Sequence, residues 1–164
     1  MIRSFSVFLL LAGSLALAGA AAAHEKTPAP SPSVPAVDAR TAPALAVVER
    51  FSTALQAGDL DTVGTLLADD VLILESGGAE RSREEYLGHH AISDAAFLKA
   101  SHVQRLRQTA QTEGTLAWIG TESEIHTSKD GQPLTVLSTE TMILRESAEG
   151  WRIVHIHWSS RPKK

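Results

Sequence analysis

The amino-acid sequence predicts an α+β domain in which three helices pack on a strongly bent antiparallel sheet. Apolar residues recur at helical spacing over about residues 42–97, and alternate with polar residues at strand spacing over about residues 103–159. Helices followed by strands, rather than interleaved with them, are typical of an α+β fold. The length of 164 residues suits one such domain.

Two segments at the N-terminus are expected to lie outside the folded domain. Arg3, the apolar run over residues 5–17 and the small residues that end at Ala23 predict a signal peptide over residues 1–23. An uncleaved anchor is less favoured, because the run is short of the roughly 20 residues that a membrane span needs. Residues 24–41 hold four prolines and predict a disordered tether. We therefore expect a periplasmic or secreted protein, free of the membrane after cleavage.

Two helices are predicted at the start of the domain, which covers residues 42–161. Apolar residues recur at helical spacing over residues 45–55, and Gly58 ends this run. Asp59 is a typical helix-capping residue, so a second short helix is expected over residues 60–67.

A short strand and a glycine turn come next. Residues 71–75 are an apolar run of strand length, which Gly77 and Gly78 end. Glu75 and Glu80 flank this turn, where charged side chains are usually solvated.

The third helix supplies the first candidate site. Ser82 with Glu85 three residues later forms a capping box, which predicts a helix from residue 82 to about residue 94 or 97. At about 100° per residue, Tyr86, His90 and Asp94 lie on or beside its apolar stripe. Buried polar groups need partners, and His90 and Asp94 lie one turn apart, where they can satisfy each other.

Antiparallel strands are predicted for the rest of the chain, over residues 103–111, 116–126, 134–145 and 151–159. Asp130 followed by Gly131 is a hairpin signal, and a second turn is expected around Glu149 and Gly150. A curved sheet wrapped around the helices would enclose a pocket.

The last strand supplies the second candidate site. Strict alternation places Trp151, Ile153, His155, His157 and Ser159 on one face and Arg152, Val154, Ile156 and Trp158 on the other. Either face can point inward. The candidate ligand-binding residues from the last two strands are Glu140, His155, His157 and Trp158. The other domain histidines, His89, His102 and His126, are expected to be peripheral.

The order of elements and two segments, residues 58–78 and 138–161, resemble the NTF2-like superfamily and, within it, the DUF4440 or SnoaL-like branch. Residues 75–98 (ESGGAERSREEYLGHHAISDAAFL) are similar to a bacterial exported subgroup. The resemblance covers about residues 42–161 and implies a cone-shaped α+β fold, a pocket at its open end and frequent homodimers. The characteristic positions that match are Tyr86, His90, Asp94, His157 and Trp158.

The superfamily includes isomerases, dehydratases, cyclases and association domains, so the resemblance implies no single activity. Its ketosteroid isomerases use a carboxylate base with an oxyanion hole made by a Tyr and an acid. Tyr86 and Asp94 do not stand at the positions of that motif, so these roles are not carried over.

Four functions remain open. The leading one is binding of a small ligand that Tyr86, His90, Asp94 and the strand residues orient, with no assigned reaction and no cofactor. The second is a proton-transfer enzyme, an isomerase or dehydratase, with His90 as the base, Asp94 as its orienter and Tyr86 as a hydrogen-bond donor. The third is a metal site made by His90, Asp94, His155 and His157. The fourth is a dimeric association module whose pocket is filled by side chains.

Overall fold

The computed structural model describes residues 39–164, so the predicted signal peptide and residues 24–38 of the predicted tether lie outside the described residues. The helices are α1 (Ala42–Ala57), α2 (Leu60–Leu66), α3 (Arg83–Gly88) and α4 (His90–Lys99). The strands are β1 (Leu67–Glu75), β2 (Gly78–Glu80), β3 (His102–Glu113), β4 (Leu116–Lys129), β5 (Gln132–Ser147) and β6 (Gly150–Pro162). No helix within residues 39–164 is long and apolar enough to cross a membrane.

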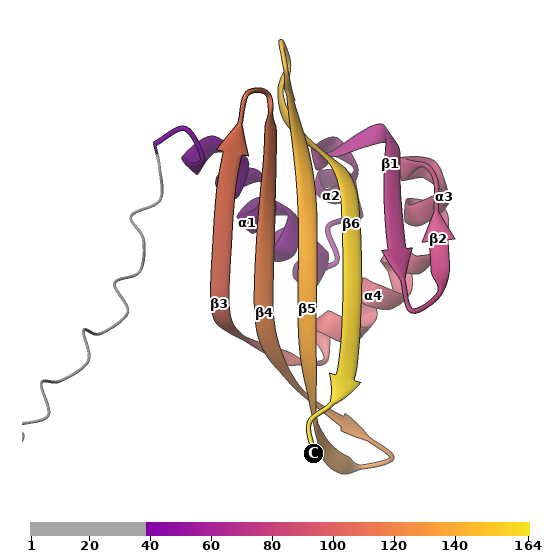
Figure 1. Ribbon diagram of the computed structural model, residues 1–164. Helices are drawn as coiled ribbons and strands as arrows, with labels where there is room; N and C mark the ends of the chain where they lie inside the picture. The colour runs from indigo at the N-terminus through magenta and orange to yellow at the C-terminus, as the bar shows by residue number, and fades with distance from the viewer. Residues whose placement is uncertain (1–38) are drawn as a thin grey trace, which may run out of the picture. The chain divides into compact units, whose positions relative to one another are not determined.

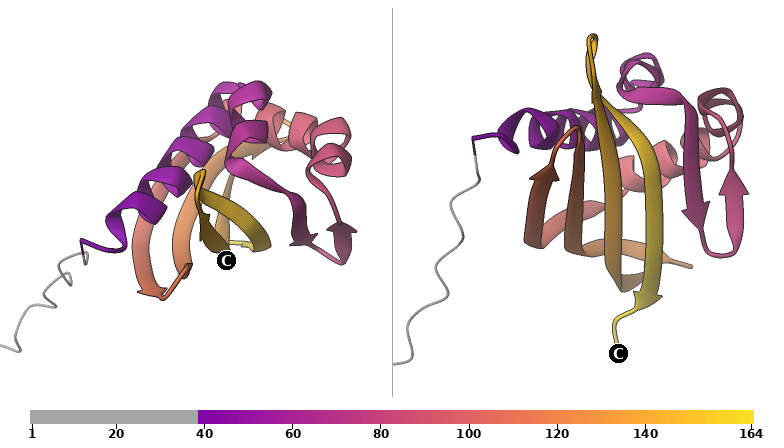
Figure 2. Two further views of the ribbon diagram at one scale, coloured as in Figure 1. Left: turned by 90° about the horizontal axis from the view of Figure 1, so that it is seen from above. Right: turned by 45° about the horizontal axis from the view of Figure 1, so that its top comes forward.

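The strands form one sheet in the order β2-β1-β6-β5-β4-β3, and the helices lie against one face of it (Figure 1). The sheet curves around these helices, as the views of Figure 2 show. The α+β fold class predicted from the sequence is therefore confirmed. Neighbouring strands are antiparallel except for β1 and β6, which pair in parallel, so the sheet is mixed rather than purely antiparallel.

The helix α1 ends, and the helix α2 begins, where the sequence predicts. Gly58 follows α1 with a φ of 79°, a left-handed conformation that favours glycine. The Asp59 side chain accepts a hydrogen bond from the Thr62 N–H at 3.0 Å and so caps α2. Val48 and Phe51 on α1 and Val63 on α2 are buried against the sheet.

The single third helix that the sequence predicts is two helices. The capping box is present, because the Ser82 hydroxyl accepts from the Glu85 N–H at 3.0 Å. However, α3 stops after Gly88, and His89 has φ −135° and ψ −93°, which are not helical values. Glycine has low helix propensity, so the chain can leave the helix here. The helical wheel drawn through His90 and Asp94 therefore does not continue from Tyr86.

The strand β2 is absent from the sequence-based prediction, because three residues are too few to show alternation. Ser76 and Gly77, with φ of 47° and 89°, form the tight turn that folds β2 back onto β1. Glu80 is the last residue of β2 and is buried, contrary to the expectation that it is solvated.

A β-bulge changes which residues of β6 share a face. Leu144 pairs with Ile153 and Ile143 pairs with His155, so Val154 is an extra residue in β6. As a result Ile153 joins Ile156 in the core, where both are fully buried. Alternation therefore holds on each side of the bulge, but the set of residues that faces the core changes at Val154, so the single alternating face expected from the sequence is wrong.

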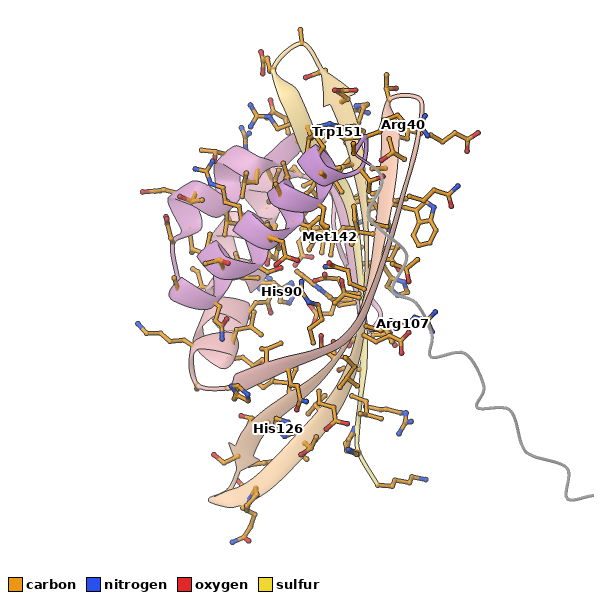
Figure 3. All side chains as sticks on the ribbon, turned by 90° about the vertical axis from the view of Figure 1, so that its left-hand side faces the viewer. Arg40, His90, Arg107, His126, Met142 and Trp151 are labelled. Atoms are coloured by element: carbon orange, nitrogen blue, oxygen red, sulfur yellow. The ribbon has the colours of Figure 1, made fainter. Side chains whose placement is uncertain are left out.

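The core lies between the helices and the concave face of the sheet. Figure 3 shows Met142 on this helix-facing side and Arg107 pointing away from it. The largest fully buried side chains are Tyr86, Phe51, Leu67, Ile73, Ile119, Met142, Leu144, Ile153 and Ile156. This core fills one end of the space under the sheet and leaves the other end open.

Candidate functional site

A cavity of about 470 Å³ lies between α1, α4 and the concave face of the sheet. Its apolar walls come from Phe51, Leu55, Phe97, Leu98, Val103, Ile125 and Val136. Its acidic lining, among the described residues, consists of Glu49, Glu75, Asp94 and Glu140, and its one lining cation is Arg105. Figure 3 places His90 between the helices and the sheet. The domain therefore has an open cavity rather than one filled by side chains.

Rows of paired residues form the floor of this cavity. Thr121, Glu140 and Trp158 face one another across β4, β5 and β6. Alternate residues of a strand share a face, so the next row on the same strands also faces inward. This row consists of Ser123, Ser138 and Ser160. Each of these residues lines the cavity.

Glu140 is held in place by Trp158. The indole Nε1–H of Trp158 donates a hydrogen bond to Glu140 Oε2 at 2.7 Å. Burial raises the pKa of the Glu140 carboxyl, the Trp158 hydrogen bond opposes this rise, and the nearby charge of Glu49 adds to it. Glu49 itself forms an ion pair with Arg105 on β3.

Tyr86 and Asp94 form a second polar pair. The Tyr86 hydroxyl, which belongs to a fully buried side chain, donates to Asp94 Oδ2 at 3.1 Å. Burial raises the pKa of Tyr86 above its ordinary value, and the Asp94 charge raises it further. Burial also raises the pKa of Asp94, against the opposing effects of the Tyr86 hydrogen bond and of His90. The Tyr86 ring lies 6.2 Å from that of Trp158, so the two pairs are neighbours.

Glu75, at the end of β1, is the third carboxyl with a raised pKa in the cavity. Burial is the main cause, the Asp94 charge adds to it, and His90 opposes it. Three carboxyls with raised pKa values, those of Glu75, Asp94 and Glu140, therefore line the same cavity. The sequence pattern placed Glu75 beside a turn and did not reveal this, because the hairpin formed with β2 was not predicted.

His90 does not pair with Asp94 as the sequence suggested. Its Nδ1 faces Glu80 Oε1 in an ion pair, and the Glu80 side chain is only 4% exposed. The reason is the break at His89, which starts a new helix at His90, and the short β2, which brings Glu80 beside that junction. His90 still acts electrostatically on Asp94 and Glu75. It therefore lies beside the acidic end of the cavity.

The histidines of β6 lie on the other face of the sheet. His155 Nδ1–H donates to the backbone oxygen of Leu72 at 2.8 Å, and His157 is exposed next to the inward-facing Trp158. Neither lines the cavity. The four residues of the expected metal site, His90, Asp94, His155 and His157, are thus not brought together, because the β6 bulge and the pleat direct the last two outward.

Comparison with known proteins identifies the family. A family model described as a SnoaL-like domain matches residues 44–162. This chain belongs to the SnoaL-like family. The resemblance to NTF2-like proteins and to their SnoaL-like branch is thereby confirmed. Among curated proteins, none matches the chain.

Solved structures with the same fold include a candidate isomerase and association domains. A candidate ketosteroid isomerase from Shewanella frigidimarina is 35% identical to this SnoaL-like domain, with a TM-score of 0.67 over 70% of this chain and 92% of that chain. The hub of the kinase CaMKII from S. rosetta is 21% identical, with a TM-score of 0.62 over 78% of this chain and 100% of that chain. An NTF2-like protein with a cystatin-like fold from Novosphingobium aromaticivorans is 16% identical, with a TM-score of 0.60 over 71% and 79%. The last two likenesses show the fold alone.

Proposed function

We propose that this SnoaL-like domain binds a small, partly apolar organic molecule in the cavity. The observation that carries the proposal is the combination of apolar walls with three carboxyls, Glu75, Asp94 and Glu140, whose pKa values burial raises. Small-molecule sites are typically concave and mostly apolar, with a few converging polar groups that fix orientation. The cavity volume of about 470 Å³ falls within their usual range.

The acidic lining favours a ligand whose polar end donates hydrogen bonds or carries a positive charge. Arg105 is paired with Glu49, so it does not balance the three other acids of the cavity. An ionised carboxyl in an apolar site is stabilised by a nearby cation and destabilised by a second anion. A ligand amine would therefore lower the raised pKa values, whereas a ligand carboxylate would raise them further.

Three compounds with one apolar body test this ligand class: phenylpropylamine, phenylpropanol and phenylpropanoate. Binding is measured by calorimetry and by the shift in the unfolding midpoint. We expect the amine and the alcohol to bind and the carboxylate to bind at least tenfold more weakly. In the variant Asp94→Asn/Glu140→Gln this preference should shrink, and in Glu122→Gln, an exposed acid on the other face of the sheet, it should persist.

Two results would count against this proposal. Equal or tighter binding of the carboxylate would exclude the ligand class. Unchanged amine binding after Ser138→Trp, which places a large ring on the cavity floor, would exclude the cavity as the site.

A second candidate function is proton transfer, as in an isomerase or dehydratase. It is favoured by the contact between buried Glu80 and His90, because a buried carboxylate that holds one ring nitrogen of a His orients the ring. Here Glu80, rather than Asp94, orients the base His90, and Tyr86 with Asp94 supplies a hydrogen-bonded pair beside it. The 35% identity to a candidate ketosteroid isomerase supports a test on that substrate class.

The test uses a steroid ketone whose C=C bond moves into conjugation with the carbonyl, so that ultraviolet absorbance rises. We expect His90→Gln to abolish turnover and Glu80→Gln to reduce it by at least tenfold. His157→Gln, an exposed His of β6, is the control and should leave turnover unchanged. Turnover by His90→Gln at the wild-type rate would exclude His90 as the base.

We further propose that the chain is an exported protein of the DUF4440 branch. The charged and apolar pattern of residues 1–23 supports export, and residues 75–98 support the exported subgroup. In a bacterial host, mass spectrometry of the periplasmic fraction should find a mature N-terminus at His24. Recovery of the protein only from the cytosol, with residues 1–23 intact, would contradict export.

A further inference from the structure

We propose that Glu80, His89 and His90 form a binding site for one divalent transition-metal ion, with Zn²⁺ as the best-suited probe. Each of the three side chains offers a ligand atom, and these atoms lie within 4.8 Å of one another. This site differs from the one predicted from the sequence, since it uses neither Asp94 nor the histidines of β6. It does not depend on the proposed ligand of the cavity.

The first observation concerns Glu80. Its side chain is 4% exposed, and its Oε1 contacts His90 Nδ1 in an ion pair. Both atoms are shielded from solvent, and neither has a hydrogen bond to any other group. Metal ligands bind in their deprotonated forms. A cation held by both atoms would therefore take the place of the proton that the carboxylate and the imidazole share in the ion pair.

The second observation concerns the helix break. Consecutive residues of a continuous helix project about 100° apart, so neighbouring histidines would not share a ligand. At His89 the backbone leaves the helix, with φ −135° and ψ −93°. The rings of His89 and His90 consequently meet edge to face, with centroids 4.3 Å apart. The break gives two adjacent histidines the convergence that a metal site needs.

The donor set indicates the kind of metal. Two imidazole nitrogens and one carboxylate oxygen form a set that Zn²⁺ uses in three-ligand sites, where a water or a ligand takes the fourth position. Ca²⁺ and Mg²⁺ prefer oxygen donors alone, and no thiolate is available in this chain to favour Cu⁺. The carboxylate of Glu80 supplies a negative charge that favours a cation here.

The location gives the site a role at the cavity. His90 does not line the cavity, but it acts electrostatically on Asp94 and Glu75, which do, so an ion bound to His90 would lie close to these two acids. With its Nδ1 on the metal, His90 would no longer be available to Glu80 as a proton-transfer pair. Metal binding and the His90–Glu80 base are therefore alternatives that one set of variants can separate.

The test measures zinc binding to the untagged protein after treatment with a chelator. Calorimetry with ZnCl₂ and elemental analysis after dialysis should give one Zn²⁺ per chain, and zinc should raise the unfolding midpoint. His89→Ala should lower the affinity at least tenfold. The His89 side chain is exposed, so this variant should keep the fold, which circular dichroism checks. Glu80→Gln and His90→Gln should also lose zinc binding.

A matched control comes from the pair His102 and His126, whose rings stack 6.0 Å apart on β3 and β4. Replacing His102 by Ala should leave zinc binding unchanged, and so should His24→Ala near the N-terminus. Absence of stoichiometric zinc from the wild-type protein would overturn the proposal. So would zinc binding that survives His89→Ala but is lost in His102→Ala or His24→Ala.

Discussion

Glu140 shows how a single residue of the cavity couples charge to stability. Its pKa is raised by burial, so the folded protein binds this proton more tightly than the unfolded chain does. The resulting stability is fully present below the unfolded carboxyl pKa of about 4.3 and is lost as the pH rises through the raised folded value.

Glu140→Gln should therefore stabilise the protein increasingly as the pH rises. The amide stays neutral and keeps an oxygen that accepts from Trp158 Nε1–H. Thermal unfolding from about pH 4 to about pH 8 should show the advantage of the variant growing by a few degrees. Glu122→Gln, at an exposed position, should show no such trend. A constant difference between Glu140→Gln and the wild type would contradict this account.

Tyr86 allows a second test at the residue scale, because it is the only tyrosine in the chain. Its pKa is raised by burial and by the Asp94 charge. The folded state therefore loses stability as the pH rises above the unfolded tyrosine pKa of about 10. We expect tyrosinate absorbance to appear only together with the loss of circular dichroism. Gradual titration near pH 10, as in a free tyrosine, with the fold intact would disprove the burial of this hydroxyl.

At the scale of elements, two helices end at a glycine, and only one of these two positions requires glycine for its backbone conformation. Gly88 has space for a Cβ and no left-handed φ, whereas Gly58 also has space but adopts a φ of 79°. Gly88→Ala should raise the free energy of unfolding by about 0.4–1 kcal/mol by restricting the unfolded chain. Gly58→Ala should lower it, since its conformation is strained for alanine. Denaturant unfolding of both variants decides between these outcomes, and a loss of stability in Gly88→Ala would show that the junction needs glycine.

The elements also show what the sequence could predict about the site. Caps are local, so Gly58, Asp59 and Ser82 marked helix ends correctly. The break at His89 and the three-residue β2 leave too little periodicity to detect, yet they decide that His90 contacts Glu80. Tyr86 and Asp94 were found together as polar residues beside an apolar stripe, but their mutual hydrogen bond crosses the break and was not foreseen.

At the scale of the whole folded domain, the order of helices and strands was predictable and the pairing of distant strands was not. Local patterns gave the four long strands and the Asp130–Gly131 turn, which the structure confirms. The parallel contact of β1 with β6 joins segments about 80 residues apart and has no local signal. The bulge at Val154 likewise depends on how β6 fits between its neighbours, and it turned Ile153 to the face opposite His155.

The outer face of the sheet carries apolar side chains that a second copy of the domain can cover. Trp118 on β4 is 41% exposed, lies opposite Ile143 on β5, and alternates with the buried Ile119, so it points away from the helices. Leu116 and Leu72 are exposed on strands of the same sheet. We propose a homodimer through this face, because these exposed apolar side chains would be buried between two copies of the sheet.

Trp118→Arg should turn this dimer into a monomer, because it places a charge where apolar side chains would be buried together. Light scattering coupled to size-exclusion chromatography should give twice the mass of one chain for the wild type and the mass of one chain for the variant. Ile92→Arg is the matched control, since Ile92 is 58% exposed but lies on α4, on the helical side. A wild-type monomer, or a dimer broken by Ile92→Arg and not by Trp118→Arg, would exclude the outer face of the sheet as the interface.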